Sequence, residues 1–392
     1  MSKDAKNVPT LRFKGYSDAW EKRKLREVSD VRDGTHASPK YYSQGYPLVT
    51  SKNLTSAGLD FSNISLISEL DYKNINKRSR VDKGDILFGM IGTIGTPVMV
   101  HESNFGIKNV ALIKEREAVL NSFLVQLLKS PAFINYIRNE NVGGTQKFLS
   151  LNTIRNFRFS FPTSKEQAMV SRFLEKIDSL IAATQDKIDA LEQAKRALLQ
   201  RLFDQSWRFK GYSDPWEKRK LGELAEFING RAYKQDELLA SGKYPVLRVG
   251  NFYTNDKWYY SNLELPEKYY AEEGDLLYTW SATFGPHIWI GPRVIYHYHI
   301  WKVALKNIFE KDFALQFFEA DRVRLLNSTN GSTMIHVTKK DMESKGVLLP
   351  DVYEQRTIGD LLKRVDHLIA ATQSRLSSLE LLKKALLQDL FI

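Results

Sequence analysis

RFKGYSDAWEKRKL, residues 12–25, returns almost letter for letter as RFKGYSDPWEKRKL, residues 208–221, with one alanine replaced by proline. The similarity extends well beyond this segment. KGDILFGMIGTIG at 83–95 matches EGDLLYTWSATFG at 273–285, and LIAATQ followed by ALLQ occurs in both halves of the chain. The chain is therefore an internal duplication of one structural plan, with loops of different length in the two copies.

Length and charge limit the classes of function. The 392 residues suffice for two domains of about 150 residues plus further elements. Lys and Arg outnumber Asp and Glu by 57 to 46, and the net charge of +11 favours a polyanionic partner such as nucleic acid. The absence of Cys excludes disulfides, thiolate nucleophiles and Cys-based zinc sites. Without a signal peptide or an apolar run of about 18 residues, we expect a soluble cytoplasmic protein.

Each copy starts with a globular part, at residues 11–162 and 205–350, and residues 1–10 are expected to be a flexible terminus. Short β-branched and aromatic runs predict strands, one after the turn in VDKGDILF and one or two in VIYHYHIWKVAL. Helical spacing of apolar residues in NSFLVQLLKSPAFINYIRNE, and in its counterpart FALQFFEADRVRLL, predicts a helix. Both parts are therefore expected to be similar mixed α/β domains.

A long helix follows each globular part, at 163–204 and 351–392. Apolar residues alternate at spacings of four and three over more than four heptads, which predicts a coiled coil. Lys195 and Lys383 are polar members at matching positions of this pattern. The predicted seam otherwise consists of Val170, Leu174, Ile177, Ile181, Thr184, Ile188, Leu191, Leu198, Leu202, Ile358, Leu362, Val365, Ile369, Thr372, Leu376, Leu379, Leu386 and Leu390.

The order of these parts along the chain predicts an arrangement. Only residues 204–206 separate the first helix from the second globular part. The second helix must bury its apolar stripe, and packing on the first helix requires it to run antiparallel. We therefore expect a dumbbell with approximate two-fold symmetry, suited to touching two places on one DNA duplex. A helix pair alone is equally typical of an oligomerisation device.

The doubled segment lies where these parts should meet. Arg208 follows the end of the first helix, and Arg12 lies where the second helix should finish. We expect this segment to be a structural joint that anchors each domain to a helix end, with Trp20 and Trp216 packed there.

Several motifs together resemble a known family. The doubled RFKGYSD segment, the GD[IL]L strand, and EQ followed by a leucine-rich helix ending in ALLQ resemble the specificity subunit of type I restriction-modification enzymes. In that family, two target-recognition domains each read half of a bipartite DNA sequence, and the paired helices set the spacer and dock methyltransferase subunits. The resemblance implies a non-catalytic chain that binds double-stranded DNA, methyltransferase subunits and restriction-translocase subunits. S-adenosylmethionine, ATP and Mg²⁺ are expected only in those partners.

Motifs of catalysis do not occur in the sequence. It has no NPPY-like or DPPY-like tetrapeptide and no GK[ST] nucleotide loop, and PDV at 350–352 does not continue into an acidic-x-Lys element. GMIGTIG has GxxGxxG spacing rather than the dinucleotide fingerprint, so it predicts a turn. The alternative to a DNA reader is a coiled-coil scaffold whose domains bind proteins.

Residues that contact bases or phosphates are expected on loops interrupted by Gly and Pro. In the first domain these are RDGTHASPKYYSQGYPLVTSKN, the basic strip KNINKRSR and GGTQKF, although each residue could equally belong to an ordered turn or a solvated charge run. The candidates are Arg32, Thr35, His36, Lys40, Lys52, Asn53, Lys73, Lys77, Arg78, Arg80, Thr145, Gln146 and Lys147.

In the second domain, basic and aromatic residues interleave, which is typical of a nucleic-acid surface. Most of its Tyr and Trp are nevertheless expected in the core. No metal is expected at His297 and His299, because no third ligand follows at a suitable spacing. The candidates are Arg231, Tyr233, Lys234, Arg248, Asn251, Lys257, Tyr259, Trp280, Thr283, Ser332, Thr333 and His336.

Overall fold

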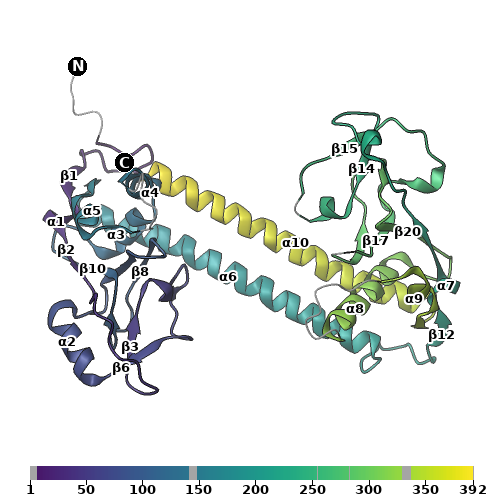
Figure 1. Cartoon of the computed structure of the whole chain (residues 1–392), viewed down its shortest axis with the longest axis horizontal. Helices are drawn as coiled ribbons and strands as arrows, with labels where there is room; N and C mark the ends of the chain where they lie inside the picture. The colour runs from purple at the N-terminus through teal and green to yellow at the C-terminus, as the bar shows by residue number, and fades with distance from the viewer. Residues whose placement is uncertain (1–6, 141–147, 254, 282, 329–336, 392) are drawn as a thin grey trace. The chain divides into compact units, whose positions relative to one another are not determined.

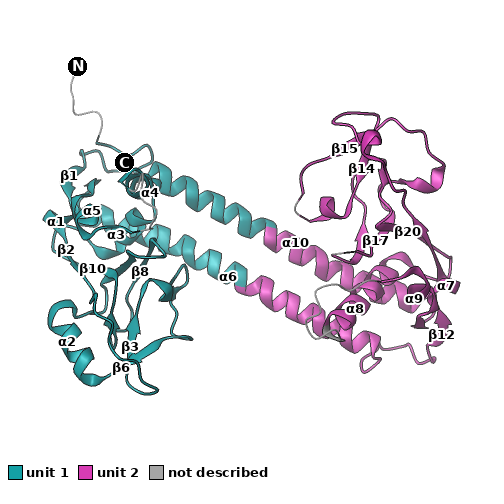
Figure 2. Cartoon of the chain, in the orientation of Figure 1, with its two compact units in different colours: residues 1–185, 374–392 teal, residues 186–373 magenta. Residues whose placement is uncertain are grey.

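The chain divides into two compact units (Figure 2). The computed structural model describes residues 7–140, 148–253, 255–281, 283–328 and 337–391. Unit 1 comprises residues 1–185 and 374–392, and unit 2 comprises residues 186–373. Each unit therefore holds one copy of the duplicated plan together with part of both long helices.

Unit 1 is a mixed α/β domain built on small sheets (Figure 1). Its strands pair in the orders β1–β11, β2–β10–β7–β8, β6–β3–β9 and β4–β5. These strands are β1 (Glu21–Lys24), β2 (Asp30–Asp33), β3 (Tyr46–Val49), β4 (Leu54–Thr55), β5 (Gly58–Leu59), β6 (Ser65–Ile67), β7 (Ile86–Gly89), β8 (Gly95–Met99), β9 (Gly106–Ile107), β10 (Val110–Lys114) and β11 (Arg158–Phe161). Its helices are α1 (Leu25–Val28), the 3-10 turn η2 (Ser51–Asn53), α2 (Glu69–Ser79), α3 (Asn121–Leu128), α4 (Pro131–Glu140), α5 (Leu151–Asn156) and the first part of α6 (Ser164–Phe203).

Unit 2 repeats three of these four strand orders, with one strand added to one sheet and no counterpart of the β4–β5 pair among its described residues. The orders are β12–β21, β13–β20–β17–β18 and β15–β14–β19–β16. These strands are β12 (Glu217–Lys220), β13 (Ala225–Asn229), β14 (Tyr244–Leu247), β15 (Tyr259–Ser261), β16 (Tyr270–Ala271), β17 (Leu276–Thr279), β18 (Gly285–Ile288), β19 (Val294–Tyr296), β20 (Ile300–Leu305) and β21 (Gly346–Leu349). Its helices are α7 (Leu221–Leu224), η3 (Gln235–Glu237), η4 (Val249–Phe252), η5 (Glu267–Tyr269), α8 (Lys311–Ser328), α9 (Lys339–Ser344) and the first part of α10 (Val352–Asp389).

The structure contains the predicted strands and helices, but one predicted helix is divided into two. The turn in VDKGDILF leads into β7, whose four residues are all buried, and VIYHYHIWKVAL forms the two strands β19 and β20. The single helix expected at NSFLVQLLKSPAFINYIRNE is two helices, α3 and α4, because Pro131 cannot continue the hydrogen-bond pattern of α3. Its counterpart α8 has no proline and continues for 18 residues.

The core of unit 1 joins one face of the four-stranded sheet to the ends of both long helices. Phe88 on β7, Phe123 on α3, Leu174 on α6 and Leu390 on α10 belong to one buried cluster. In unit 2, Tyr278 on β17 and Leu362 on α10 belong to the corresponding cluster. Burial of apolar area at about 25 cal/mol per Å² is what fastens each domain to the helices.

The two long helices run antiparallel within each unit. Lys383 of α10 pairs with Asp178 of α6 in unit 1, and Lys195 of α6 pairs with Asp366 of α10 in unit 2. Every residue of the predicted seam is buried or half-buried. With 40 residues, α6 is about 60 Å long. No helix among the described residues is both long and apolar enough to cross a membrane.

The doubled segment is the expected joint. Arg12 donates two hydrogen bonds to Glu166 on α6, at 2.7 and 2.8 Å, and the Leu11 amide donates to the Asp389 carbonyl near the end of α10 at 3.0 Å. In unit 2, Arg208 donates to Glu354 at 2.9 and 2.6 Å. Trp20 and Trp216 are both buried. The near-identity of the two segments therefore reflects one structural role performed twice.

Candidate nucleic-acid interface

Three backbone segments of unit 1 meet at the end of β2. Residues 33–36 leave β2, Val49 ends β3, and residues 107–109 lead from β9 to β10. We call these residues the unit 1 junction. Its hydrogen bonds run from Gly34 N to Val110 O (2.9 Å), Thr35 N to Ile107 O (2.9 Å), Lys108 N to Val49 O (2.9 Å) and Asn109 N to Thr35 O (3.2 Å).

Unit 2 repeats this hydrogen-bond pattern, with one additional residue, His299, before the buried strand β20. The unit 2 junction comprises residues 229–232, Leu247 and residues 296–298. Its hydrogen bonds run from Gly230 N to Ile300 O (3.0 Å), Arg231 N to Tyr296 O (3.1 Å), His297 N to Leu247 O (2.9 Å) and Tyr298 N to Arg231 O (3.1 Å). The backbone of the junction is therefore a fixed scaffold in both copies.

A glycine makes each junction possible. A Cβ on Gly34 would lie 2.5 Å from the carbonyl oxygen of Ile107, and one on Gly230 would collide with the carbonyl oxygens of Tyr296 and His297. Only a residue without a side chain allows the segments to come this close. These two glycines are at matching positions of the duplication, DG in the first copy and NG in the second.

A buried carboxylate orients the polar side chains of the unit 1 junction. Asp33 is 8% exposed; its Oδ2 lies 2.8 Å from Nε2 of His36, and its Oδ1 pairs with Arg78 of α2. The other ring nitrogen of His36, Nδ1, lies 2.9 Å from Oδ1 of Asn109. The Asp33 carboxylate thus holds an imidazole and a guanidinium group, and the imidazole in turn contacts the Asn109 amide.

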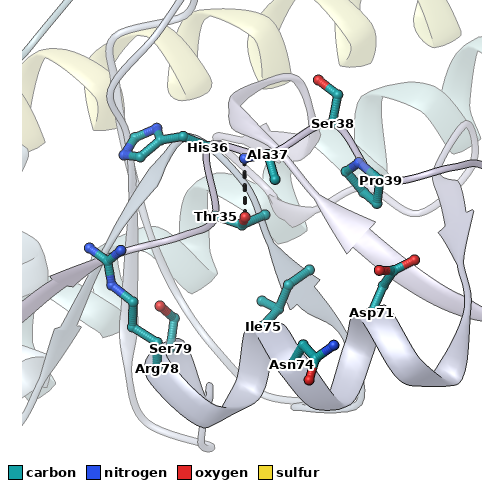
Figure 3. Close-up of a pocket in the computed structure, with 10 residues that line it drawn as sticks. All are labelled: Thr35, His36, Ala37, Ser38, Pro39, Asp71, Asn74, Ile75, Arg78 and Ser79. Carbon is teal, nitrogen blue, oxygen red and sulfur yellow. Dashed lines mark hydrogen bonds between the residues drawn. The ribbon is translucent and has the colours of Figure 1, made fainter.

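A cavity of about 470 Å³ lies between the loop that follows this junction and α2 (Figure 3). The Thr35 hydroxyl shapes the loop by accepting a hydrogen bond from the Ala37 amide at 3.2 Å. The lining residues are Thr35, His36, Ala37, Ser38, Pro39, Asp71, Asn74, Ile75, Arg78 and Ser79. Hydrogen-bonding groups from two elements therefore face one concave surface.

The basic strip at 73–80 belongs mainly to α2, a helix that the sequence analysis did not predict. The available signal was the N-cap: Ser68 Oγ accepts a hydrogen bond from the Asp71 amide at 3.1 Å. Lys73 pairs with Glu69 at 2.7 Å, and Arg80 just beyond the helix pairs with Asp82 at 3.2 Å. The helix still presents several exposed cations on its surface.

The remaining basic candidates of unit 1 differ in their surroundings. Arg32 pairs with Asp30 at 2.7 Å and donates to the Arg78 carbonyl at 3.2 Å. Lys40, Lys52 and Lys77 are exposed. Of these cations, the exposed lysines are the ones best placed to meet a phosphate.

Asn53 has a structural role in its loop. It is 8% exposed, and both ends of its amide are used inside a turn: Oδ1 accepts from the Thr50 amide at 2.9 Å and Nδ2 donates to the Asp60 carbonyl at 3.0 Å. Its side chain therefore stabilises the loop, and its contact with DNA stays a prediction. Asn251 performs the same task in unit 2, accepting from the Arg248 amide at 3.0 Å and donating to the Asn255 carbonyl at 3.0 Å.

Arginine and tyrosine pair repeatedly in unit 2. Arg231 donates two hydrogen bonds to Glu237, at 2.9 and 2.7 Å, and its guanidinium carbon lies 5.2 Å from the Tyr233 ring centroid. These hydrogen bonds from Arg231, with one from the Lys234 amide, lower the pKa of Glu237 to about 2. Burial raises the pKa of Tyr233. The Arg231 side chain is therefore held in place by a carboxylate that stays ionised at neutral pH.

A second group of cations surrounds the Tyr259 ring. The guanidinium carbon of Arg248 lies 4.3 Å from the ring centroid, and Nζ of Lys257 lies 5.3 Å from it. Lys234 and Thr283 are exposed elsewhere in unit 2.

Several aromatic rings lie close together at the unit 2 junction. The ring centroid of His297 lies 6.4 Å from that of Tyr233 and 4.5 Å from that of Tyr298. Trp280 donates through Nε1 to the Tyr298 carbonyl at 2.9 Å. Burial, together with His299 and Arg248, lowers the pKa of His297 to about 4. At neutral pH this imidazole therefore carries one donor and one acceptor.

The chain matches one family model twice. The model is described as the type I restriction modification DNA specificity domain, and it covers residues 17–193 and 213–381. The chain belongs to this family. The duplicated plan is thus two copies of the DNA specificity domain, each holding one junction.

Similar proteins agree with this membership. A protein of Methanocaldococcus jannaschii, provisionally named the specificity subunit of type I restriction enzyme MjaX, is 24% identical over 406 residues, which is 94% of this chain and 92% of the relative. The MjaIX specificity subunit of the same organism is 24% identical over 253 residues, 59% of this chain and 57% of the relative. The crystal structure of an S subunit from M. genitalium has the same fold, with a TM-score of 0.63, 16% identity and coverage of 98% and 99% of the two chains.

Sequence reasoning reached only part of each DNA specificity domain's junction. It selected Thr35, His36 and Arg231 as candidates. It missed Lys108, Asn109, His297 and Tyr298, although each of these lies between a short strand and the next strand along the chain. Thr145, Gln146, Lys147, Ser332, Thr333 and His336 lie outside the described residues. Within the described part of the chain, no group of three or more His, Asp or Glu side chains is arranged to hold a metal ion.

Proposed function

We propose that this chain is the non-catalytic DNA sequence-recognition subunit of a type I restriction-modification complex, and that each specificity domain reads one block of a bipartite target. The observation that carries the proposal is the pair of junctions, in which one backbone scaffold presents different side chains. Base edges are distinguished by donors, acceptors and methyl groups, so two unlike blocks require unlike side chains on comparable supports.

Charge supports DNA as the ligand. Lys40, Lys52 and Lys77 in unit 1 and Lys257 in unit 2 are exposed, and the chain carries a net charge of +11. Lysines that neutralise phosphates release counterions, so binding should weaken steeply as salt increases.

The long helices are proposed to set the unread gap and to dock methyltransferase subunits. Besides their seam, they expose apolar side chains, Met169 and Phe173 on α6 and Leu368 and Leu381 on α10. Exposed apolar residues on helices are common at protein–protein interfaces. In this proposal the methyltransferase and restriction-translocase subunits supply S-adenosylmethionine, ATP and Mg²⁺ chemistry.

Binding of the complex to DNA tests this function against the scaffold alternative. The chain would be purified with its methyltransferase partner and titrated with genomic DNA fragments at 50 and 200 mM salt. We expect tight binding at the lower salt and a loss of at least about 100-fold at the higher, as several phosphate contacts require. Absence of salt-sensitive DNA binding would favour a scaffold that binds only proteins.

A further inference from the structure

We propose that the junction is the part of each specificity domain that discriminates between DNA sequences, and that Lys108 and Asn109 in unit 1, with His297 and Tyr298 in unit 2, are specificity-determining residues. This inference rests on the proposed function and adds to it the side chains that read bases.

The first support is the contrast between a shared pattern of backbone hydrogen bonds and changed side-chain chemistry. Four side-chain positions match between the junctions through their hydrogen bonds and chain order. Thr35 corresponds to Arg231, His36 to Ala232, Lys108 to His297, and Asn109 to Tyr298. A purely structural loop would keep its side chains as the joint does, where Arg12 and Arg208 perform one task with one residue type.

The second support is that the side chains of the unit 1 junction are held in position. Nδ1 of His36 lies against Asn109, Nε2 lies against Asp33, and Nζ of Lys108 donates to Ser38 Oγ at 3.0 Å. Asn109 adopts a left-handed backbone conformation, with φ of 58°, that turns the chain immediately before β10. Side chains fixed before binding lose little conformational freedom when they meet a base edge, which favours discrimination over general affinity.

The third support is the different hydrogen-bonding character of the two junctions. Unit 1 presents the ammonium of Lys108 and the amide of Asn109, which are rich in donors and suit the acceptors of a major-groove edge. Unit 2 presents the imidazole of His297 and the ring and hydroxyl of Tyr298, which is 38% exposed. An exposed aromatic ring suits the thymine methyl group, and the imidazole suits an edge with both donor and acceptor. The two junctions should therefore prefer different base pairs.

The test compares block-specific discrimination in variants of the complete complex. The bipartite motif would first be read from adenine methylation by the wild-type complex. Binding of purified complexes would then be measured on the cognate duplex and on duplexes with one base pair changed in either block. The unit 1 variant is Lys108→Ala with Asn109→Asp, which keeps the shape of the asparagine and its left-handed backbone. The unit 2 variant is His297→Gln with Tyr298→Phe.

We expect each variant to lose at least about tenfold of the wild-type discrimination at one or two base pairs of a single block, since one bidentate base contact contributes on that scale. The other block is an internal control for folding and should keep its full discrimination. The exposed-lysine variant Lys52→Ala is the matched control in unit 1, and should weaken binding to all duplexes alike.

Three results would overturn the inference. Unchanged discrimination in both blocks would place base reading elsewhere in the specificity domains while leaving the proposed function intact. Equal loss of affinity for every duplex would make the junction a structural or phosphate-binding element. Loss of DNA binding by the Asn109→Asp single variant, in a complex that still assembles, would lead to the same conclusion. Failure of the wild-type complex to show any two-block motif would instead refute the proposed function.

Discussion

A buried carboxylate fixes each domain to the start of a long helix. Glu166 and Glu354 have side chains that are 1% exposed, and each is paired with an arginine of the doubled segment. The hydrogen bonds to these carboxylates raise the pKa of Arg12 and Arg208. A buried ion without its partner is strongly unfavourable, which makes both members of each pair necessary.

Removing one arginine should therefore destabilise the unit that contains it. We expect Arg12→Ala to lower the free energy of unfolding by about 3–5 kcal/mol, because Glu166 is left buried and unpaired. Urea unfolding of the full chain measures this. The matched control is Arg23→Ala, since Arg23 and its partner Glu21 are about half exposed and such pairs contribute about 1 kcal/mol or less. Equal effects of the two variants would contradict the role of the joint.

Histidine burial makes the stability of unit 2 depend on pH. Burial, with Arg322, lowers the pKa of His287 to about 4, so the folded ring stays neutral where the unfolded chain, with a pKa near 6.5, binds a proton. The contribution of the neutral His287 ring to the free energy of unfolding is fully present above about pH 6.5 and is lost as the pH falls toward 4. We expect the free energy of unfolding to decrease from pH 7 to 4.5.

The variant His287→Phe should reduce that decrease. Phe cannot titrate, and it can keep the stacking on Phe252, whose ring centroid lies 4.1 Å from that of His287. Urea titrations at several pH values give the slope directly. The same slope in the variant and the wild-type chain would show that His287 is not responsible.

At the scale of elements, an ion pair joins the two long helices in each unit. Its lysine, Lys195 in unit 2 and Lys383 in unit 1, occupies a position that the sequence periodicity assigns to the seam. Lys195 Nζ lies 2.5 Å from Asp366 Oδ1, and Gln316 donates to the same carboxylate group at 2.8 Å. A polar residue among apolar seam positions favours one register over its alternatives.

Charge reversal should reveal this pairing. Lys195→Asp places two carboxylates together, and we expect it to destabilise the chain by roughly 1–3 kcal/mol, whereas Lys195→Asp combined with Asp366→Lys should recover most of that loss. Thermal unfolding of the wild type, the two single variants Lys195→Asp and Asp366→Lys, and the double variant provides the comparison. Additive destabilisation in the double variant would mean that the two residues do not interact.

Elements with a strong local pattern were predictable from sequence. The leucine spacing located α6 and α10, and the turn in VDKGDILF located β7. The α2 helix was missed because its face is largely polar and only its N-cap Ser68 marks it. The break at Pro131 shows that a helical apolar pattern can continue past a residue that ends the backbone hydrogen bonding.

At the scale of the whole molecule, the two-domain duplication was readable from the repeat alone, but the junctions were not. Thr35 pairs with Lys108 through an isolated parallel bridge, and β3 pairs in parallel with β9. Residues separated by roughly 60 to 70 positions meet there, and no local spacing reports such a contact. Gly34 and Gly230 are the sequence features that indicate a close backbone approach, but the sequence does not show which segment they approach.

The proposed role of the helices predicts a change in target length. One heptad inserted after Thr184 and one after Leu376 would keep the seam pattern and add about 10 Å to the helix pair. We expect the unread gap of the DNA target to lengthen by up to about three base pairs, at 3.4 Å each, with both blocks unchanged. Methylation mapping of the altered complex measures the gap. An unchanged gap with active enzyme would argue against the helices as a spacer.

The most direct test of the central claim is the methylation motif produced when this chain is expressed with its methyltransferase partner in a host lacking adenine methylation. Two specific blocks separated by an unread gap are expected. Replacing residues 208–350 with the corresponding part of another family member should change one block and leave the other as it was. A single continuous motif, or a change of both blocks after this replacement, would contradict the account.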